Sequence, residues 1–148
     1  MALLERLSRE LKAAMLARDA DRLSTLRLLK SAVGYAQIES KTETLADAEV
    51  LGLIRKEIKK RRDAIEHYEK GGRPELASRE KQEILVLESF LPQPLTPEEL
   101  EQVVRAAIHE TGATGKKQMG QVIKAAQAKA AGRAEGKAIS DLVARLLP

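Results

Sequence analysis

The stretch "LPQPLTPEEL", Leu91–Leu100, contains three prolines within six positions and divides the chain into two parts. Proline lacks the backbone N–H that a continuing helix requires, and it favours extended geometry in the residue before it. No helix is therefore expected to run through this stretch. We predict a domain boundary at about residue 93, with an N-terminal helical domain over residues 1–92 and a C-terminal domain over 93–148.

The second half of the same stretch carries the signals of a helix start. Thr96 can cap the helix, Pro97 suits the first helical position, and Glu99 can bond back to the cap residue. Beyond it, apolar residues recur at helical spacing in three segments, and glycines separate these segments. The sequence therefore predicts three short helices after residue 96, with apolar stripes over residues 100–108, 119–126 and 139–147.

The part before the boundary predicts about four helices, because leucine and isoleucine recur three and four residues apart. No alternation typical of a strand persists anywhere. We therefore expect an all-α protein, with an N-terminal helical hairpin or bundle of about four helices followed by a small C-terminal three-helix domain. The expected caps and stops are Asp19 or Asp21, Thr44 with Asp47, a left-handed Gly71, and Pro74.

Composition narrows the classes of function. The 148-residue chain contains no cysteine, so disulfide and thiolate chemistry are excluded and a reducing, cytoplasmic location is the expectation. No apolar run approaches the roughly 20 residues that span a bilayer, so no membrane partner is predicted. The first residues, "MALLERLSRELKAAM", carry charges every few positions, which is unlike a signal peptide.

Few residues offer catalytic chemistry. The two histidines, His67 and His109, have no metal-binding spacing, and each is expected near a helix end, where the dipole favours it. The segment "GATGKKQ", Gly112–Gln118, lacks the glycine spacing and the hydroxyl residue of a phosphate-binding loop. We therefore predict no catalytic residues, no metal and no cofactor.

Two basic segments remain to be explained. The run "RKEIKKRR", Arg55–Arg62, is interpreted as a solvated helix face, since an isoleucine interrupts it. A patch that binds phosphates is the alternative interpretation. In the C-terminal part, glycines lie at expected helix joints, where free amide groups and nearby cations favour phosphate. A simple helix–helix turn would also explain these glycines. The candidate nucleic-acid-binding residues are Gly115, Lys116, Lys117, Lys124, Lys129, Gly132, Arg133, Gly136 and Lys137.

Three longer stretches resemble the GatB/YqeY family, specifically its free-standing, YqeY-like members. They are "RLSTLRLLKSAVGYAQIE" (Arg22–Glu39), the segment Glu49–Leu100 with its "FLP", and "MGQVIKAAQAKAAGRAEGKAIS" (Met119–Ser140). The order of "FLP", "MG" and "GRAEG" carries the resemblance. "GRAEG" has Glu135 where aspartate is commoner in the family, and the segment after "MG" is unusually rich in alanine.

The resemblance implies an all-helical protein in two parts. The same module forms the tail of the B subunit of the tRNA-dependent amidotransferase, where it contacts tRNA while other domains perform the chemistry. We therefore expect a non-catalytic, tRNA-binding-like accessory module with tRNA as partner. With only Tyr35, Tyr68 and Phe90 as aromatic residues, recognition should use RNA shape and backbone and not stacked bases.

Two alternatives stay open. The first is an adaptor that binds a translation-related protein and needs no phosphate contact. The second, ranked last, is a carbon–nitrogen ligase with glutamine as amide donor, a label that the resemblance suggests is inherited from the larger enzyme. The sequence does not specify the oligomeric state.

Overall fold

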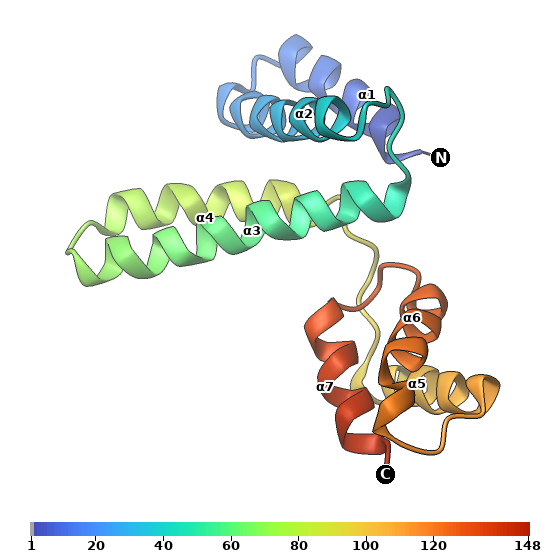
Figure 1. The fold of residues 1–148 in the computed structure, drawn as a ribbon. Coiled ribbons are helices and arrows are strands. Elements are labelled where there is room, and N and C mark those ends of the chain that lie inside the picture. The colour runs from blue at the N-terminus through green and yellow to red at the C-terminus, as the bar shows by residue number, and fades with distance from the viewer. Residues whose placement is uncertain (1) are drawn as a thin grey trace. The chain divides into compact units, whose positions relative to one another are not determined.

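The computed structural model describes residues 2–148 and shows an all-α fold (Figure 1). That range forms seven α-helices and one 3-10 helix, and no strand. The predicted fold class is confirmed, with four helices in the N-terminal part and three in the C-terminal part. The elements are α1 (Leu3–Leu16), α2 (Ala20–Ser40), α3 (Asp47–Lys70), α4 (Pro74–Glu88), α5 (Pro97–Thr111), η1 (Lys116–Gln118), α6 (Met119–Ala130) and α7 (Gly136–Leu146).

The chain packs as two compact units, Met1–Leu91 and Pro92–Pro148. Unit 1 holds α1–α4 and unit 2 holds α5–α7, and each has its own cluster of buried apolar side chains. A separate core is the property that lets a domain fold by itself. Independent folding of the two parts, as domains 1–92 and 93–148, stays a prediction.

Unit 1 is built on the antiparallel pair α3–α4, with α1 and α2 on one side of it (Figure 1). Leu26 of α2, Ile54 of α3 and Leu87 of α4 are almost completely buried where these helices meet. The free energy gained by removing such side chains from water is the main force holding the helices together. The turn end of the α3–α4 pair extends beyond α2 in Figure 1.

The turn between α3 and α4 uses the second of two adjacent glycines. Gly71 has a φ of −85° and Gly72 has a φ of +71°, so the prediction of a left-handed Gly71 is wrong by one residue. The N–H of Arg73 donates to the carbonyl of Tyr68 at 2.8 Å, which closes the helix end in a Schellman arrangement. Pro74 then begins α4, as predicted.

Two aspartates at predicted helix starts have different roles. Asp19 caps α2 by accepting the N–H of Arg22 at 3.2 Å, as predicted. Thr44 does not cap α3, because the cap residue is Ala46, which has no side-chain acceptor. Asp47 instead accepts the N–H of Leu3 at 3.0 Å. This carboxylate satisfies a free amide in the first turn of α1 and ties that helix to α3.

The basic run Arg55–Arg62 is not solvated throughout, because Arg61 is buried between α3 and α4. Its Nε donates to Glu83 at 2.9 Å, and its Nη1 donates to the carbonyl of Glu57 at 3.1 Å. Glu80 lies at the edge of this cluster, 4.0 Å from Arg61. The interpretation of the run as a solvated face is therefore wrong for Arg61, since two acids on α4 neutralise it.

Burial raises the pKa of Glu80 above its ordinary value of 4.5, and the negative charge of Glu83 adds to the effect. A raised pKa in the folded state stabilises the protein below pH 4.5, and that contribution is lost as pH rises through the folded-state pKa. At neutral pH the ionised carboxylate of Glu80 therefore weighs against folding.

We predict that Glu80→Gln raises the free energy of unfolding at pH 7 by about 0.5 kcal/mol. The gain should shrink as pH falls and vanish below about pH 4, where the parent carboxyl is protonated as well. Urea unfolding at a series of pH values measures it. Glu88→Gln on the same helix is the control, because Glu88 is half-exposed and faces Arg62 at 3.8 Å. A lower free energy of unfolding for Glu80→Gln at pH 7 would show that the ionised carboxylate of Glu80 does not oppose folding.

Unit 2 contains α5, α6 and α7, which enclose Val104, Val122 and Val143 with no measurable exposure. Helix α5 begins with the predicted capping box: the N–H of Glu99 donates to the hydroxyl of Thr96 at 3.1 Å, and the Glu99 carboxylate accepts the N–H of Thr96 at 3.3 Å. This reciprocal pair fixes where the chain leaves residues 91–96, which we call the proline segment, and becomes helical.

Candidate nucleic-acid interface

The nine predicted site residues lie along α6 and at both of its ends. Gly115 precedes η1, which contains Lys116 and Lys117 and runs directly into α6. The remaining residues lie on α6 (Lys124 and Lys129), in the loop after it (Gly132 and Arg133), and at the start of α7 (Gly136 and Lys137). The two glycine joints are thus separated by the length of α6, about 18 Å for 12 residues.

Arg133 forms hydrogen bonds that contribute to the packing of unit 2. Its Nε donates to the carbonyl of Gln93 at 2.8 Å, and its own carbonyl accepts the N–H of Leu95 at 2.8 Å. Its Nη2 also lies 3.6 Å from the Glu99 carboxylate. These contacts hold the proline segment against the turn between α6 and α7. Arg133 therefore has a structural role that its place in a basic segment does not reveal.

Lys129 is also paired within the chain. Its Nζ lies 2.6 Å from the carboxylate of Glu110 on α5. It stands in the last turn of α6, where a cation is favoured by the helix dipole as well. An exposed pair of this kind contributes at most about 1 kcal/mol to folding. It does, however, neutralise Lys129 as a ligand for phosphate.

Four cations of the predicted site have no ion pair within residues 2–148: Lys116, Lys117, Lys124 and Lys137, all of them exposed. Lys117 and Lys124 are seven positions apart, so they fall on one side of the continuous η1–α6 segment. The residues on that side are exposed, and none is acidic. We call this surface the α6 face, comprising Lys117, Gly120, Gln121, Lys124, Gln127 and Ala128.

The α6 face is open near its start and reaches the beginning of α7. A Cβ placed on Gly120 would meet no other atom within 4 Å, so the backbone is open to a ligand there. At the other end, a Cβ on Gly136 would lie 3.6 Å from the side-chain amide of Gln127. The first turn of α7, with Lys137, therefore adjoins the α6 face.

The helix starts contribute less to phosphate binding than the sequence indicates. Gly115 has an extended backbone, with a φ of −165°, and the 3-10 helix after it has only three residues. At α7 the cap residue is Glu135, whose negative charge opposes a phosphate at the free amides. Gly132 has a φ of +80°, which the turn after α6 requires. Lysine side chains, more than amide dipoles, therefore supply the positive potential of this surface.

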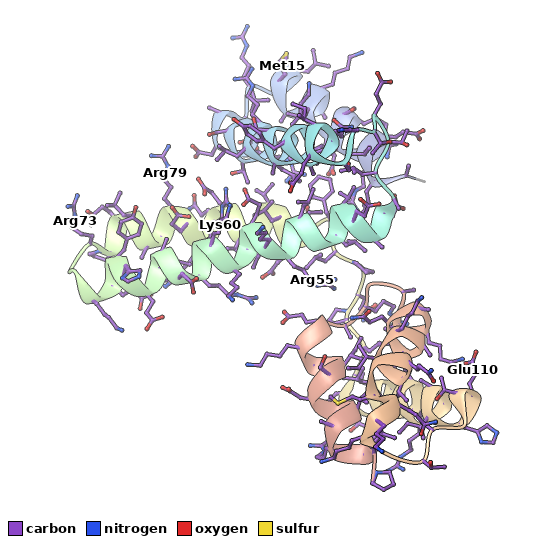
Figure 2. All side chains as sticks on the ribbon, viewed as in Figure 1. Met15, Arg55, Lys60, Arg73, Arg79 and Glu110 are labelled. Atoms are coloured by element: carbon purple, nitrogen blue, oxygen red, sulfur yellow. The ribbon has the colours of Figure 1, made fainter. Side chains whose placement is uncertain are left out.

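Sequence reasoning missed a polar cleft in unit 1. It lies between α2 and α4, has a volume of about 270 Å³, and is lined by Asp19, Asp21, Arg22, Ser24, Thr25, Arg79, Gln82, Glu83 and Val86. In Figure 2, Arg79 points toward the side of α4 on which α2 lies. Arg22 is already paired with Glu10 at 2.8 Å. No local signal predicts this cleft, because its two walls are far apart in the sequence.

Across residues 2–148, histidine and acidic side chains do not gather in a group of three that could hold a metal ion. His67 and His109 are exposed in the last turns of α3 and α5, as the sequence indicates. Within the same range, each helix is too short or too polar to traverse a lipid bilayer.

The fold and the surface define a class: a small all-helical protein in two units, with a basic helical face on its C-terminal unit. The model of the YqeY-like protein family matches residues 4–147, which is nearly the whole chain. The chain belongs to this family.

Several fungal proteins are similar to the chain. An uncharacterised protein of Schizosaccharomyces pombe is 40% identical over 85 residues, covering 57% of this chain and 68% of that protein. The protein named altered inheritance of mitochondria protein 41, mitochondrial, is 33% identical over 85 residues in Vanderwaltozyma polyspora, covering 57% and 46%. In Eremothecium gossypii it is 29% identical over 113 residues, covering 75% and 62%. The chain thus matches about half to two thirds of the length of these mitochondrial relatives.

These relatives contradict the prediction of a cytoplasmic location. The named ones, from four fungi, are mitochondrial proteins. The prediction rested on the lack of cysteine and of a bilayer-spanning run. The first feature excludes disulfide and thiolate chemistry, and the second concerns only spanning a membrane. Neither feature distinguishes one compartment from another, which is why the inference was wrong.

We predict that Arg133→Met destabilises unit 2 by about 1 kcal/mol, because a charged hydrogen bond to the Gln93 carbonyl is lost from a half-exposed position. Hydrogen exchange at the amide of Leu95, which donates to the Arg133 carbonyl, should become faster. Lys124→Met is the matched control and should change stability by less than about 0.5 kcal/mol. Equal effects of the two substitutions would show that Arg133 is not structural.

Proposed function

We propose that the protein is a non-catalytic accessory module that binds the phosphate backbone of tRNA along the α6 face. The observation that supports the proposal is the division of the predicted site: Lys129 and Arg133 are paired with carboxylates of unit 2, and the other four cations are exposed without an ion pair in residues 2–148. Cations that stabilise nothing inside the chain can form contacts with phosphate without first breaking an ion pair.

The shape and chemistry of the α6 face suit a polyanion backbone. Gly120 and Ala128 are small, so phosphates can come close to the helix. The amide groups of Gln121 and Gln127 can donate hydrogen bonds to phosphate oxygens between the lysines. Unit 2 has no tryptophan, tyrosine or phenylalanine, so base stacking on aromatic side chains contributes nothing there. Recognition would therefore follow RNA shape and not base sequence.

The choice of tRNA comes from the resemblance to the tail of the amidotransferase B subunit. That resemblance covers the segment Met119–Ser140, which includes most of the α6 face. The proposal leaves the chemistry of amidation to other proteins, so this chain would supply a contact and no reaction. Lys137 extends the surface onto α7, while Glu135 limits it there.

Salt dependence tests the proposal. If Lys117, Lys124 and Lys137 each neutralise a phosphate, the logarithm of the tRNA association constant should fall with the logarithm of salt with a slope of roughly −2 to −3. The double variant Lys117→Glu/Lys124→Glu should bind at least about tenfold more weakly, and its slope should be smaller by about 2. Fluorescence anisotropy with labelled tRNA at roughly 25–200 mM KCl gives both quantities, because the screening of charges by salt changes strongly over this range.

The control is Arg105→Glu/Arg145→Glu, which changes the net charge of unit 2 equally but lies outside the α6 face, on α5 and α7. It should retain most of the tRNA affinity. Equal weakening by both double variants would show that net charge, and not the α6 face, determines binding. No saturable binding at the lowest salt would contradict the proposal and favour the adaptor alternative.

A further inference from the structure

Helix α2 presents an exposed apolar face that no element of unit 1 covers. Tyr35, Ile38 and Leu28 are 75%, 77% and 47% exposed, although α2 packs closely with α1, α3 and α4 on its other side. Large apolar side chains gathered on one surface commonly mark a protein contact. The helical period places Ser24, Arg27, Ser31 and Gly34 on the same face. We call these four residues, together with Leu28, Tyr35 and Ile38, the α2 face.

The two halves of this face have opposite shapes. The N-terminal half contains a shallow hollow of about 300 Å³, lined by Ala20, Leu23, Ser24, Arg27, Leu28 and Ser31. The C-terminal half carries the protruding side chains of Tyr35 and Ile38. Ser31 lies between the two halves, four residues from Tyr35 and seven from Ile38.

We propose that the α2 face binds the α2 face of a second copy of this chain, antiparallel, with the two-fold axis at Ser31. In this arrangement, a residue a given number of positions after Ser31 faces the residue the same number before it in the other copy. Ile38 then faces Ser24, and Tyr35 faces Arg27. The protruding residues of each copy enter the hollow of the other.

The face is complementary to itself at each of these positions. Gly34 faces Leu28, so the large side chain meets a residue without one. Arg27 can stack on the ring of Tyr35, a cation–π contact. The two copies of Arg27 are eight residues apart along the helix pair, about 12 Å, which exceeds the screening length at physiological salt. The face carries no acidic residue that would oppose this pairing.

Gly34 supports a close helix contact. Glycine within a helix is less favourable than alanine, and a Cβ at Gly34 would meet nothing within 4 Å in this chain. No contact within unit 1 therefore requires glycine there. Close approach of Leu28 from a second copy would explain why a residue without a side chain stands at position 34.

The first test is the mass of the full-length chain as a function of concentration, measured by sedimentation equilibrium. A single helix pair is a small interface, so we expect a dimer with a dissociation constant of roughly 1–100 µM. The variant Tyr35→Ala/Ile38→Ala should weaken dimerisation by more than about tenfold. Both residues are exposed in the monomer, and unchanged helical circular dichroism should confirm that the variant folds. A chain that stays monomeric at every concentration, or a variant that dimerises as well as the parent, overturns the proposal.

The second test locates the axis and uses the lack of cysteine in the chain. Ser31→Cys places two thiols across the axis and should form a disulfide-linked dimer under mild oxidation. Ser24→Cys lies on the same face, also replaces an exposed serine, and places the two thiols about 21 Å apart, too far to bridge. Crosslinking of Ser31→Cys alone supports the arrangement. Equal crosslinking of both variants, or of neither, contradicts it.

Discussion

The hydrogen bonds between Arg133 and the proline segment hold the entry to α5 in place within unit 2. The Arg133 carbonyl and Nε bind the Leu95 amide and the Gln93 carbonyl, both at 2.8 Å. They join the entry to α5 with the turn between α6 and α7. Val122 and Ala126 bury the inner side of α6, so holding the C-terminal end of that helix helps to fix which of its residues face solvent. The proposed RNA contact depends on this geometry.

The structure separates two uses of positive charge that look alike in the sequence. Arg61 and Arg133 are held by carbonyls and carboxylates, and they contribute to packing. Lys117 and Lys124 are exposed and contribute nothing to the core. Reversing the charge of Arg133 would weaken RNA binding indirectly, because it would disturb the packing that supports the α6 face. Reversing the charge of an exposed lysine would remove the proposed contact with phosphate directly. The proposed site therefore rests on the lysines.

Features whose partners lie within a few residues could be predicted from the sequence. The capping box at Thr96 and Glu99 and the cap at Asp19 are of this kind, because the side chain bonds to a neighbouring amide. The pairing of Arg133 with Gln93 and of Arg61 with Glu83 could not, since these residues are 40 and 22 positions apart. Periodicity shows that α2 has apolar residues, but only packing shows that Tyr35 and Ile38 stay exposed. The position of the left-handed glycine was missed because either residue of the pair can adopt that conformation.

The proposed tRNA contact on the α6 face is tested most directly by an NMR titration of the isotope-labelled full chain with tRNA at low salt. We expect saturable shifts of backbone amides in residues 116–128 and at Lys137, with unit 1 amides unchanged. Shifts confined to the α2–α4 cleft, or no shift at any tRNA concentration, would contradict it.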